Sequence, residues 1–499
     1  MKNDSLSPIL RESEAMIDKA CHRSVNPDIK KRQISCAGVS MTLYYIEGLV
    51  SGSKIELHML TPLMKLKELP KESRAELLAK SVLSVSECEV TESLAAVLDA
   101  VFYGGAALII DGDSYAAVAD AKNFAKRGIG KPVAEQVVIG PHEAFNEALR
   151  DNLTILRRIL RTENFISESA EVGTRIKTQA AILYLSGIAD EKAITETRRR
   201  ISGIALDHVE GIGVLMQLIE DEPNALLPQF VITERPDRIV SFMLEGQICI
   251  LLDGSAQALC LPSNLFTFLH APDDSYIRWQ YGTFNRIVRF VGVCVSILLP
   301  AISVSAIRYQ PGLLPPPLLT SVMEAQSKAP LPVGEEIAAM LLFFYLINEA
   351  GMRVPGIMGS SLGLVSSLVL GSAAVDAELV SPLLIIIVAV SGLGLYAAPN
   401  YGLGMGLRLW QFILLIFASC FGLTGLAIGG SLALMSACAL RSLGAPYLAP
   451  LLPKRPRNPD LMLRLPVWRQ RLRGITASPY SLRRSSGRMR AWEEDDDED

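Results

Sequence analysis

The chain contains one pattern twice, and this internal repeat limits the folds that are open to its first half. GGAALIIDG (104–112) aligns without gaps with GQICILLDG (246–254), so both apolar runs end in Asp-Gly. A second pair precedes them, TLYYIEGLVSGSKI (42–55) and AILYLSGIADEKAI (181–194). The offsets of the two pairs are nearly equal, at 142 and 139 residues. Because self-similarity at a constant period indicates repeated structural units, we expect two similar subdomains.

The repeated Asp-Gly pairs, Asp111-Gly112 and Asp253-Gly254, admit two interpretations. An acidic residue at the end of a buried strand can be a ligand of a metal or phosphate site. Asp-Gly between two apolar runs is also a strong hairpin signal, because Gly tolerates a positive φ and Asp hydrogen-bonds the turn backbone. A catalytic pair would need partners, and no His or carboxylate lies nearby in both copies. We therefore interpret both pairs as turns.

Strands that alternate with helices predict an α/β subdomain in each half of this soluble region. We assign the first subdomain to residues 36–139 and the second to residues 171–280, with strands at 42–46 and 180–185. Residues 1–35 are polar, and we expect them to form a disordered leader.

Helices are expected within 66–102 and at 115–127 and 190–205. A longer amphipathic helix at 140–161 is expected to connect the subdomains, because its apolar residues recur at steps of three and four and so share one face. These residues are Phe145, Leu149, Leu153, Leu156 and Ile159. Pro141 suits the first turn. Cations in the last turn oppose the helix dipole, and the arginines there are Arg157, Arg158 and Arg161.

After residue 286 the chain becomes strongly apolar, and we assign residues 287–440 to an all-α, polytopic membrane domain. Apolar runs long enough to cross a bilayer need about 20 residues. The candidates are 287–307, 356–375, 382–399 and 407–440, of which the last is either one tilted or broken helix or two tightly joined ones. Residues 335–353 are apolar only in the middle and remain undecided.

Charge predicts the orientation in the membrane. Residues 454–490 carry eleven Lys or Arg and one acid, and the positive-inside rule places such a tail in the cytoplasm. Arg278, Arg286 and Arg289 flank the first span and argue the same for the N-terminal region. Both ends inside require an even number of crossings, four or six. The whole segment 454–499 is thus a basic cytoplasmic tail with an acidic end, EEDDDED.

Several classes of function lack their sequence signatures. The eight cysteines form no CxxC and the five histidines are scattered, so a metal centre is not expected. No HExxH or P-loop is present, and these are motifs of zinc hydrolases and nucleotide enzymes. We expect no catalytic residue, no cofactor and no nucleic-acid partner.

The most charged patch near a predicted helix start is TERPDRIV (233–240). Pro236 suits the first helical turn, Asp237 favours the positive end of the dipole, and Gly246 ends the helix. This structural interpretation leaves Thr233, Glu234 and Arg235 unexplained. The alternative is that Thr233, Glu234, Arg235 and Asp237 form a switch or interface.

A resemblance becomes specific once the motifs are taken in order. TERPDRIV, GPHEAFNEALRDNLTILRRIL, GTRIKTQAAILYLSGIAD, LRSLGAPYLAP and NPDLMLRLPVW together resemble the A-subunit family of spore-germinant receptors, the GerA-type germination proteins. The resemblance runs from about residue 36 to 474. It implies a non-enzymatic, multi-pass subunit of the spore inner membrane. The implied partners are a transporter-like B subunit that binds the nutrient, a lipoprotein C subunit, and further A subunits in a ring around an ion path.

The chain departs from the family pattern at two places. DDSY (273–276) has Ser275 where the family has an aromatic residue, and Tyr345 and Asn348 replace a Glu and an Arg in FFYLINEAGMRVP. A sister branch, the stage V sporulation protein that resembles the A subunit, has the same layout. A secondary transporter of a small solute is a further alternative, although transporter repeats usually lie within the membrane region.

Glu336, Glu349 and Arg353 bracket the apolar core of 335–353. This core of about eight residues rises about 12 Å, far less than a hydrocarbon layer of about 30 Å. The segment therefore either lies at the membrane surface or lines a water-filled opening, where rings of Glu can select cations. On an ideal helix Glu336 and Glu349 point in different directions, and Glu336 is the preferred pore residue.

Overall fold

The computed structural model describes residues 5–70, 73–123, 130–354, 371–378, 380–453, 463–474, 477 and 479–484. The chain divides into two compact units. The first comprises residues 1–220, 230–262 and 471–486, and the second comprises residues 221–229, 263–470 and 487–499.

The first unit contains two five-stranded sheets whose neighbouring strands are all antiparallel. The first sheet has the order β1-β2-β4-β5-β3. Its strands are β1 (Ile29–Cys36), β2 (Val39–Ile46), β3 (Cys88–Thr91), β4 (Gly105–Ile110) and β5 (Ala116–Asp120). The second sheet has the corresponding order β6-β7-β9-β10-β8. Its strands are β6 (Phe165–Val172), β7 (Thr178–Leu185), β8 (Val231–Thr233), β9 (Ile248–Leu252) and β10 (Ala258–Leu261).

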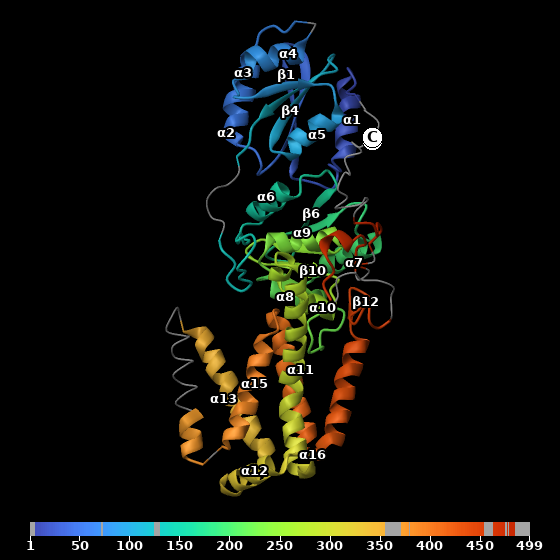
Figure 1. The fold of residues 1–499 in the computed structure, drawn as a ribbon. Coiled ribbons are helices and arrows are strands. Elements are labelled where there is room, and N and C mark those ends of the chain that lie inside the picture. Colours follow the sequence, from blue (N-terminus) through green and yellow to red (C-terminus); the bar gives the residue numbers. More distant parts are fainter. Residues whose placement is uncertain are drawn as a thin grey trace, which may run out of the picture. The chain divides into compact units, whose positions relative to one another are not determined.

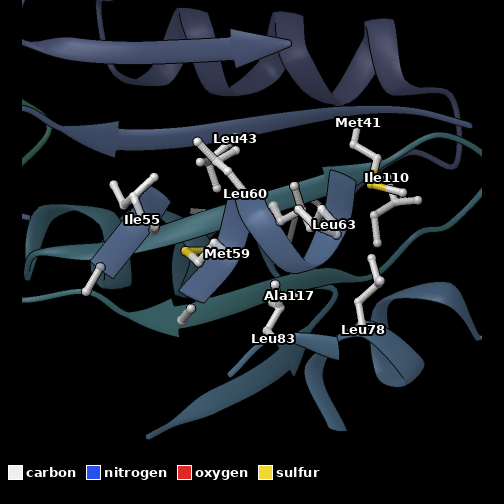
Figure 2. Packing of buried hydrophobic residues seen from close by; sticks show 14 of the residues in the cluster. Met41, Leu43, Ile55, Met59, Leu60, Leu63, Leu78, Leu83, Ile110 and Ala117 are labelled. Carbon is white, nitrogen blue, oxygen red and sulfur yellow. The ribbon is translucent and has the colours of Figure 1, made fainter. Parts of the chain in front are cut away.

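Helices cover both faces of the first sheet (Figure 1). One face packs against α1 (Leu10–Ala20) and α5 (Leu94–Phe102). The other packs against a chain of short helical segments: α2 (Gly52–Lys54), the π-helical Ile55–Leu60, α3 (Thr61–Lys65), α4 (Arg74–Leu77) and the π-helical Leu78–Val82. Figure 2 shows Ile55, Met59 and Leu63 of these segments against Met41 and Leu43 of β2.

Burial of both faces explains why β4 reads as a continuous apolar run. Successive side chains of a strand point to opposite faces. Leu108 and Ile110 accordingly lie in one core cluster, whereas Ala107 and Ile109 lie in the other. A strand that is covered on one face would instead alternate apolar with polar residues.

The two sheets repeat the same local geometry at the glycines that the sequence alignment pairs. Gly48 and Gly187 have φ of 94° and 76°, and Gly104 and Gly246 have φ of 93° and 90°. Gly112 and Gly254, in the Asp-Gly turns, both have φ of 81°. A residue with a Cβ rarely adopts such angles. The repeated glycines thus mark the same turns in both copies, as the internal repeat predicts.

The Asp-Gly turns also hold the helix that precedes each sheet. Asp111 Oδ1 accepts a hydrogen bond from the first helical amide of α1, Leu10 N (3.2 Å). Asp253 Oδ1 accepts one from the first helical amide of α6 (Leu149–Ile159), Leu149 N (3.0 Å). Neither helix has a side-chain hydrogen bond from its own N-cap residue. The turn supplies this partner from more than 100 residues away.

This equivalence of α1 and α6 corrects two predictions. Residues 1–35 are not a disordered leader, because they contain α1 and the edge strand β1. Their polar side chains pair with one another, with Lys31 Nζ 3.1 Å from both Glu14 and Asp18. The helix predicted at 140–161 begins only at Leu149, and it is the first helix of the second repeat rather than a separate connector.

A third prediction, a helix at 115–127, is wrong for residues 115–123, and its last four residues lie outside the described part of the chain. Residues 116–120 form β5, which lies between β4 and β3 in the sheet. The sequence AAVAD favours helix by local propensity, but the preceding turn places it antiparallel to β4, and pairing on both sides decides its conformation. The predicted helix at 190–205 is α7 (Glu191–Ser202), and the second repeat also contains α8 (Ile212–Ile219) and α9 (Pro236–Leu244).

Arg157 of α6 joins the two repeats. Its guanidinium is 1% exposed and lies 2.8 and 3.1 Å from the two carboxylate oxygens of Asp28, just before β1. It also donates to Phe165 O (2.9 Å) and to Asn26 Oδ1 (3.3 Å). The sequence pattern assigned Arg157 to the helix dipole, whereas the structure places it in a buried contact. Removal of one partner from a buried pair leaves an uncompensated charge.

The second unit is mainly helical. Its described helices include α10 (Leu265–Leu269), α11 (Trp279–Tyr309), α12 (Pro316–Lys328), α13 (Val333–Arg353), α15 (Pro382–Tyr396) and α16 (Tyr401–Ala439). A short hairpin follows, formed by β11 (Arg441–Ser442) and β12 (Ala445–Pro446). By length and composition, α11 and α16 can each cross a membrane, and α12 with α13 would add a third span if this pair, bent by 80°, crosses as a unit. The predicted span 356–375 falls largely outside the described residues.

The helix α16 reverses direction at Gly422, whose φ of 61° and ψ of −143° are not helical. A Cβ on Gly429 would lie 2.9 Å from Leu414 and 3.4 Å from Phe417. In a straight helix, residues 12 to 15 positions apart would be about 20 Å apart. Of the two alternatives for 407–440, two tightly joined helices is therefore the correct one. The Tyr309 hydroxyl lies 2.7 Å from Ser419 O and 2.9 Å from Cys420 O, next to the break.

The described part of the tail packs against the second repeat within the first unit. Arg473 Nε donates to Leu244 O (2.6 Å), and Arg484 Nη1 lies 2.9 Å from Glu245 Oε1. Tyr480 N donates to Ile188 O (2.8 Å). Residues on both sides of the helical unit therefore belong to one α/β unit. The tail is basic, as predicted, but part of its charge is used in these contacts.

We predict that Asp253→Asn has little effect on stability, because Asn Oδ1 can still accept from Leu149 N and Asn-Gly suits the same turn. Asp253→Ala should lower the free energy of unfolding by about 1 kcal/mol, as loss of a helix cap does. Denaturant unfolding of the full chain measures both variants. Asp207→Ala, which removes an exposed ion pair with Arg175, is the control. An equal loss in Asp253→Asn and Asp253→Ala would show that the carboxylate charge matters, as for an ion ligand.

Candidate functional site

The residues of TERPDRIV form one cluster, centred on buried Arg235, with residues 134–145, the linker that leads into α6. We call this cluster the linker clamp, and its members are Glu135, Thr233, Glu234, Arg235, Asp237 and Arg238. Thr233 ends β8, an edge strand of the second sheet. The helix α9 begins at Pro236, and Gly246 follows its end with a positive φ, as the sequence predicts.

Arg235 is the centre of the linker clamp and is fully buried, at 0% exposed. Its Nε and Nη2 atoms lie 3.1 and 2.9 Å from the Asp237 carboxylate oxygens. The same guanidinium donates to two backbone carbonyls of the linker, Glu135 O (3.2 Å) and Pro141 O (2.9 Å). Arg235 thus connects the start of α9 to the chain that enters α6.

The neighbouring Glu234 accepts hydrogen bonds from two linker amides through Oε1, Ala134 N (2.6 Å) and Glu135 N (2.8 Å). Its own carbonyl accepts from Phe145 N (2.9 Å). The linker therefore pairs with the clamp through backbone and side-chain groups on both partners. This arrangement holds residues 134–145 against the corner between β8 and α9.

Glu135 completes the linker clamp and was not found by sequence reasoning. Its carboxylate accepts from the Thr233 hydroxyl and pairs with the Arg238 guanidinium. Both side chains of the ion pair are about one-tenth exposed or less, at 10% and 8%. Glu135 lies about 100 residues from its partners, and no local spacing signals such a contact. Arg238 belongs to TERPDRIV but was not among the predicted site residues. Its spacing of three from Arg235, which places both on one side of a helix, was the signal that could have identified it.

In the helical unit, the predicted pore residues do not lie together. Glu336 is in the first turn of α13 and is 1% exposed, and its carboxylate accepts from Ser381 N (2.5 Å) at the N-terminus of α15. Glu349 and Arg353 lie at the other end of α13 and form an exposed i,i+4 ion pair (2.6 Å). Glu336 thus satisfies a helix N-terminus, where a carboxylate is favourable. Glu336 is buried, whereas Glu349 is exposed.

Asp274 is a buried acid at the start of the helical unit. From the sequence, it was considered only as part of the motif DDSY. It is 0% exposed and lies 3.2 Å from Arg286 Nε and 2.7 Å from Arg289 Nη1, both on α11. Two of the three arginines used to orient the first span are therefore partly neutralised by this acid. The cluster fixes the entry of the chain into α11.

The two cysteines of the second sheet are not suited to nucleophilic chemistry. Cys249 and Cys260 face each other across β9 and β10 with 3.0 Å between their sulfur atoms. Burial raises the pKa of the Cys260 thiol well above its usual range, which suppresses the nucleophilic thiolate. Within the described ranges, no group of three or more His, Cys, Asp or Glu residues is arranged to hold a metal ion.

Comparison with known proteins decides the family. The family model described as Bacillus/Clostridium GerA spore germination protein matches residues 15–475. The chain belongs to the GerA spore germination protein family. The resemblance drawn from the ordered motifs is therefore confirmed, and the chain is a germination protein rather than an enzyme.

Individual relatives cover most of the chain. The uncharacterized membrane protein YfkQ of Bacillus subtilis is 32% identical over 98% of this chain and 94% of its own length. Spore germination protein KA of Bacillus subtilis is 30% identical, with coverages of 93% and 86%. Spore germination protein GerQA of Bacillus cereus is 35% identical, with coverages of 78% and 78%.

One solved structure is also similar, the N-terminal domain of the A subunit of the Bacillus megaterium spore germinant receptor GerK3. It is 26% identical to this chain, with a TM-score of 0.41, and the match covers 52% of this chain and 98% of that structure.

We predict that Glu135→Ala loosens residues 134–145 without unfolding the sheets, because it removes the partner of both Thr233 and Arg238. Limited proteolysis of the full chain should then cut this segment faster, while the unfolding midpoint falls by only a few degrees. Glu171→Ala, which removes an exposed ion pair with Lys177, is the control. Unchanged cleavage within 134–145 in Glu135→Ala would contradict the clamp.

Proposed function

We propose that this chain is the A subunit of a nutrient-germinant receptor in the spore inner membrane and that it relays nutrient sensing to ion release. The family match over residues 15–475 carries the proposal. Relatives of comparable length, KA and GerQA, are spore germination proteins. The internal repeat lies in the α/β unit, whereas transporter repeats lie among the membrane helices, so the receptor is favoured over a secondary transporter.

In this proposal, several copies of the chain form a ring and α13 lines an ion path. The apolar stretch MLLFFYLI (340–347) between Glu336 and Glu349 rises about 12 Å, too little for a span in lipid. The bend of 80° between α12 and α13 supports a position away from a straight, lipid-facing span. Glu349 and Arg353 are 51% and 78% exposed in the single chain, where another copy or a water-filled opening would meet them.

The receptor would contain two further subunits, as the family resemblance implies: a transporter-like B subunit that binds the nutrient and a lipoprotein C subunit. The linker clamp is the proposed switch or interface of this chain. It holds residues 134–145 against β8 and α9 of the second repeat, so a partner that displaced this segment would act on the second repeat.

We further propose that both termini are cytoplasmic. The contacts of Arg473 and Arg484 with the second repeat support this placement, because the chain must then return to the side from which it left. An even number of crossings follows. Labelling of single introduced cysteines in intact and opened cells should report Ser481 and an N-terminal position, Ser7, on the cytoplasmic side. Reaction of a cysteine at 481 with an impermeant reagent from outside would contradict this topology.

Two substitutions separate the effect of the negative charge of Glu336 from the effect of its hydrogen bond with Ser381 N. Glu336→Gln keeps an oxygen that accepts from Ser381 N but removes the charge, whereas Glu336→Leu removes both. If Glu336 acts on the ion path, Glu336→Gln should change the rate or ion selectivity of nutrient-triggered release, while insertion and assembly stay normal. Ion release from spores that carry each variant measures this effect.

Normal ion release in Glu336→Gln, together with loss of function in Glu336→Leu, would contradict the pore role and leave Glu336 as the cap of α15. Deletion of the gene tests the broader proposal. The receptor predicts normal sporulation and loss of one nutrient response. A defect in sporulation itself would instead indicate the sister branch, the stage V sporulation protein.

A further inference from the structure

A proline within α11 leaves one backbone carbonyl without its usual helical partner. In an α-helix the amide of residue i donates to the carbonyl of residue i−4. Pro300 lies inside α11 and has no amide hydrogen, so the carbonyl of Ser296 receives no bond from it. Ser296 is 0% exposed and lies on a helix long and apolar enough to cross a membrane. In hydrocarbon an unsatisfied backbone group costs several kcal/mol, so this carbonyl needs another donor.

Two side chains from other helices supply donors. Ser391 of α15 donates through its hydroxyl to Ser296 O (2.7 Å). Gln411 of α16 donates through Nε2 to the same oxygen (2.7 Å). The Ser296 hydroxyl in turn donates to Ser391 O (2.6 Å). The bonds between α11 and α15 are therefore reciprocal.

Gln411 is the residue that brings the remaining helices into this network. Its Nε2 also lies 2.5 Å from Ser391 Oγ, and its Oε1 accepts from the Tyr345 hydroxyl of α13. Gln411 is 0% exposed, so both ends of its amide group are used within the protein. One side chain of α16 thus contacts α11, α13 and α15. We call Pro300, Ser296, Ser391, Gln411 and Tyr345 the polar joint.

Close packing of small residues brings the helices near enough for the polar joint to form. A Cβ on Gly394 of α15 would lie 2.4 Å from Gly292 O of α11. Glycines at such positions let membrane helices approach closely enough for side chains to reach the facing backbone. A shift of α15 or α16 along α11 would remove donors from Ser296 O, and Pro300 prevents α11 from replacing them.

We propose that the polar joint holds α11, α13, α15 and α16 in one arrangement and that Gln411 is the positioning residue that sets how readily these helices rearrange during ion release. This inference rests on the proposed function. Gln411 touches no ion in this account. It acts in part through the carbonyl that Pro300 leaves without a helical donor, so part of its effect depends on Pro300.

The test is a double-mutant cycle on the full chain. Gln411→Leu should lower the unfolding temperature in detergent. Pro300→Ala gives residue 300 an amide hydrogen that can bond Ser296 O within α11, so adding it to Gln411→Leu should recover part of the loss. Ser431→Ala, which removes an exposed hydroxyl from the part of α16 that follows Gly422, should leave the unfolding temperature unchanged. Strictly additive effects of Pro300→Ala and Gln411→Leu would overturn the joint.

The second readout is the nutrient concentration that gives half-maximal ion release from spores. Gln411→Leu should lower this concentration by about threefold or more, because one interhelical hydrogen bond in a membrane corresponds to about threefold on average and Gln411 makes three such contacts. Adding Pro300→Ala to Gln411→Leu should move the half-maximal nutrient concentration back toward the parent value. A lowered unfolding temperature with an unchanged nutrient threshold would overturn the positioning role. If parent spores release no ions on nutrient addition, the proposed function fails, while the stability cycle still decides whether the joint exists.

Discussion

Backbone groups that lack a partner in their own helix or strand are the constraint on which the rest of this structure depends. Such groups cost free energy unless a donor or acceptor reaches them, and polar side chains from distant parts of the chain do so repeatedly. Asp253 bonds the first amide of α6, Glu336 bonds the amide before α15, and Gln411 bonds the carbonyl of Ser296. Each contact fixes the position of one helix against another element.

This constraint changes how the charged motifs are understood. Glu336 was predicted to be a pore residue because it lies beside an apolar run. In the structure, its carboxylate accepts a hydrogen bond from the backbone amide of Ser381 at the N-terminus of α15. The interpretation of TERPDRIV as a helix start did not explain Glu234 and Arg235. In the structure, both side chains form hydrogen bonds with the backbone of the linker. A residue that holds backbone in place can still act in signalling, because a change in its partner moves the element that it holds. The linker clamp and the polar joint are two such places in separate units.

The sequence predicted what depends on local pattern and repetition. The matched glycines and Asp-Gly turns were sufficient to expect two similar α/β subdomains, and both sheets have the same strand order. Local pattern failed for α1 and β1, because Lys31 pairs with Glu14 and Asp18 and a polar segment is therefore ordered. It failed for β5 because strand pairing overrides the helix preference of alanine. Glu135 and the tail contact of Arg473 could not be predicted, since their partners lie about 100 and 229 residues away.

The central claim is that this GerA-family chain forms an ion path that opens in response to a nutrient. The most direct test measures ion flux through the purified receptor, with all its subunits, in lipid vesicles. The mass of the same purified complex is determined by native mass spectrometry. The account predicts several copies of this chain in each complex and cation flux that begins when the nutrient is added. A complex with a single copy of this chain, and no nutrient-dependent flux from vesicles that bind the nutrient, would contradict it.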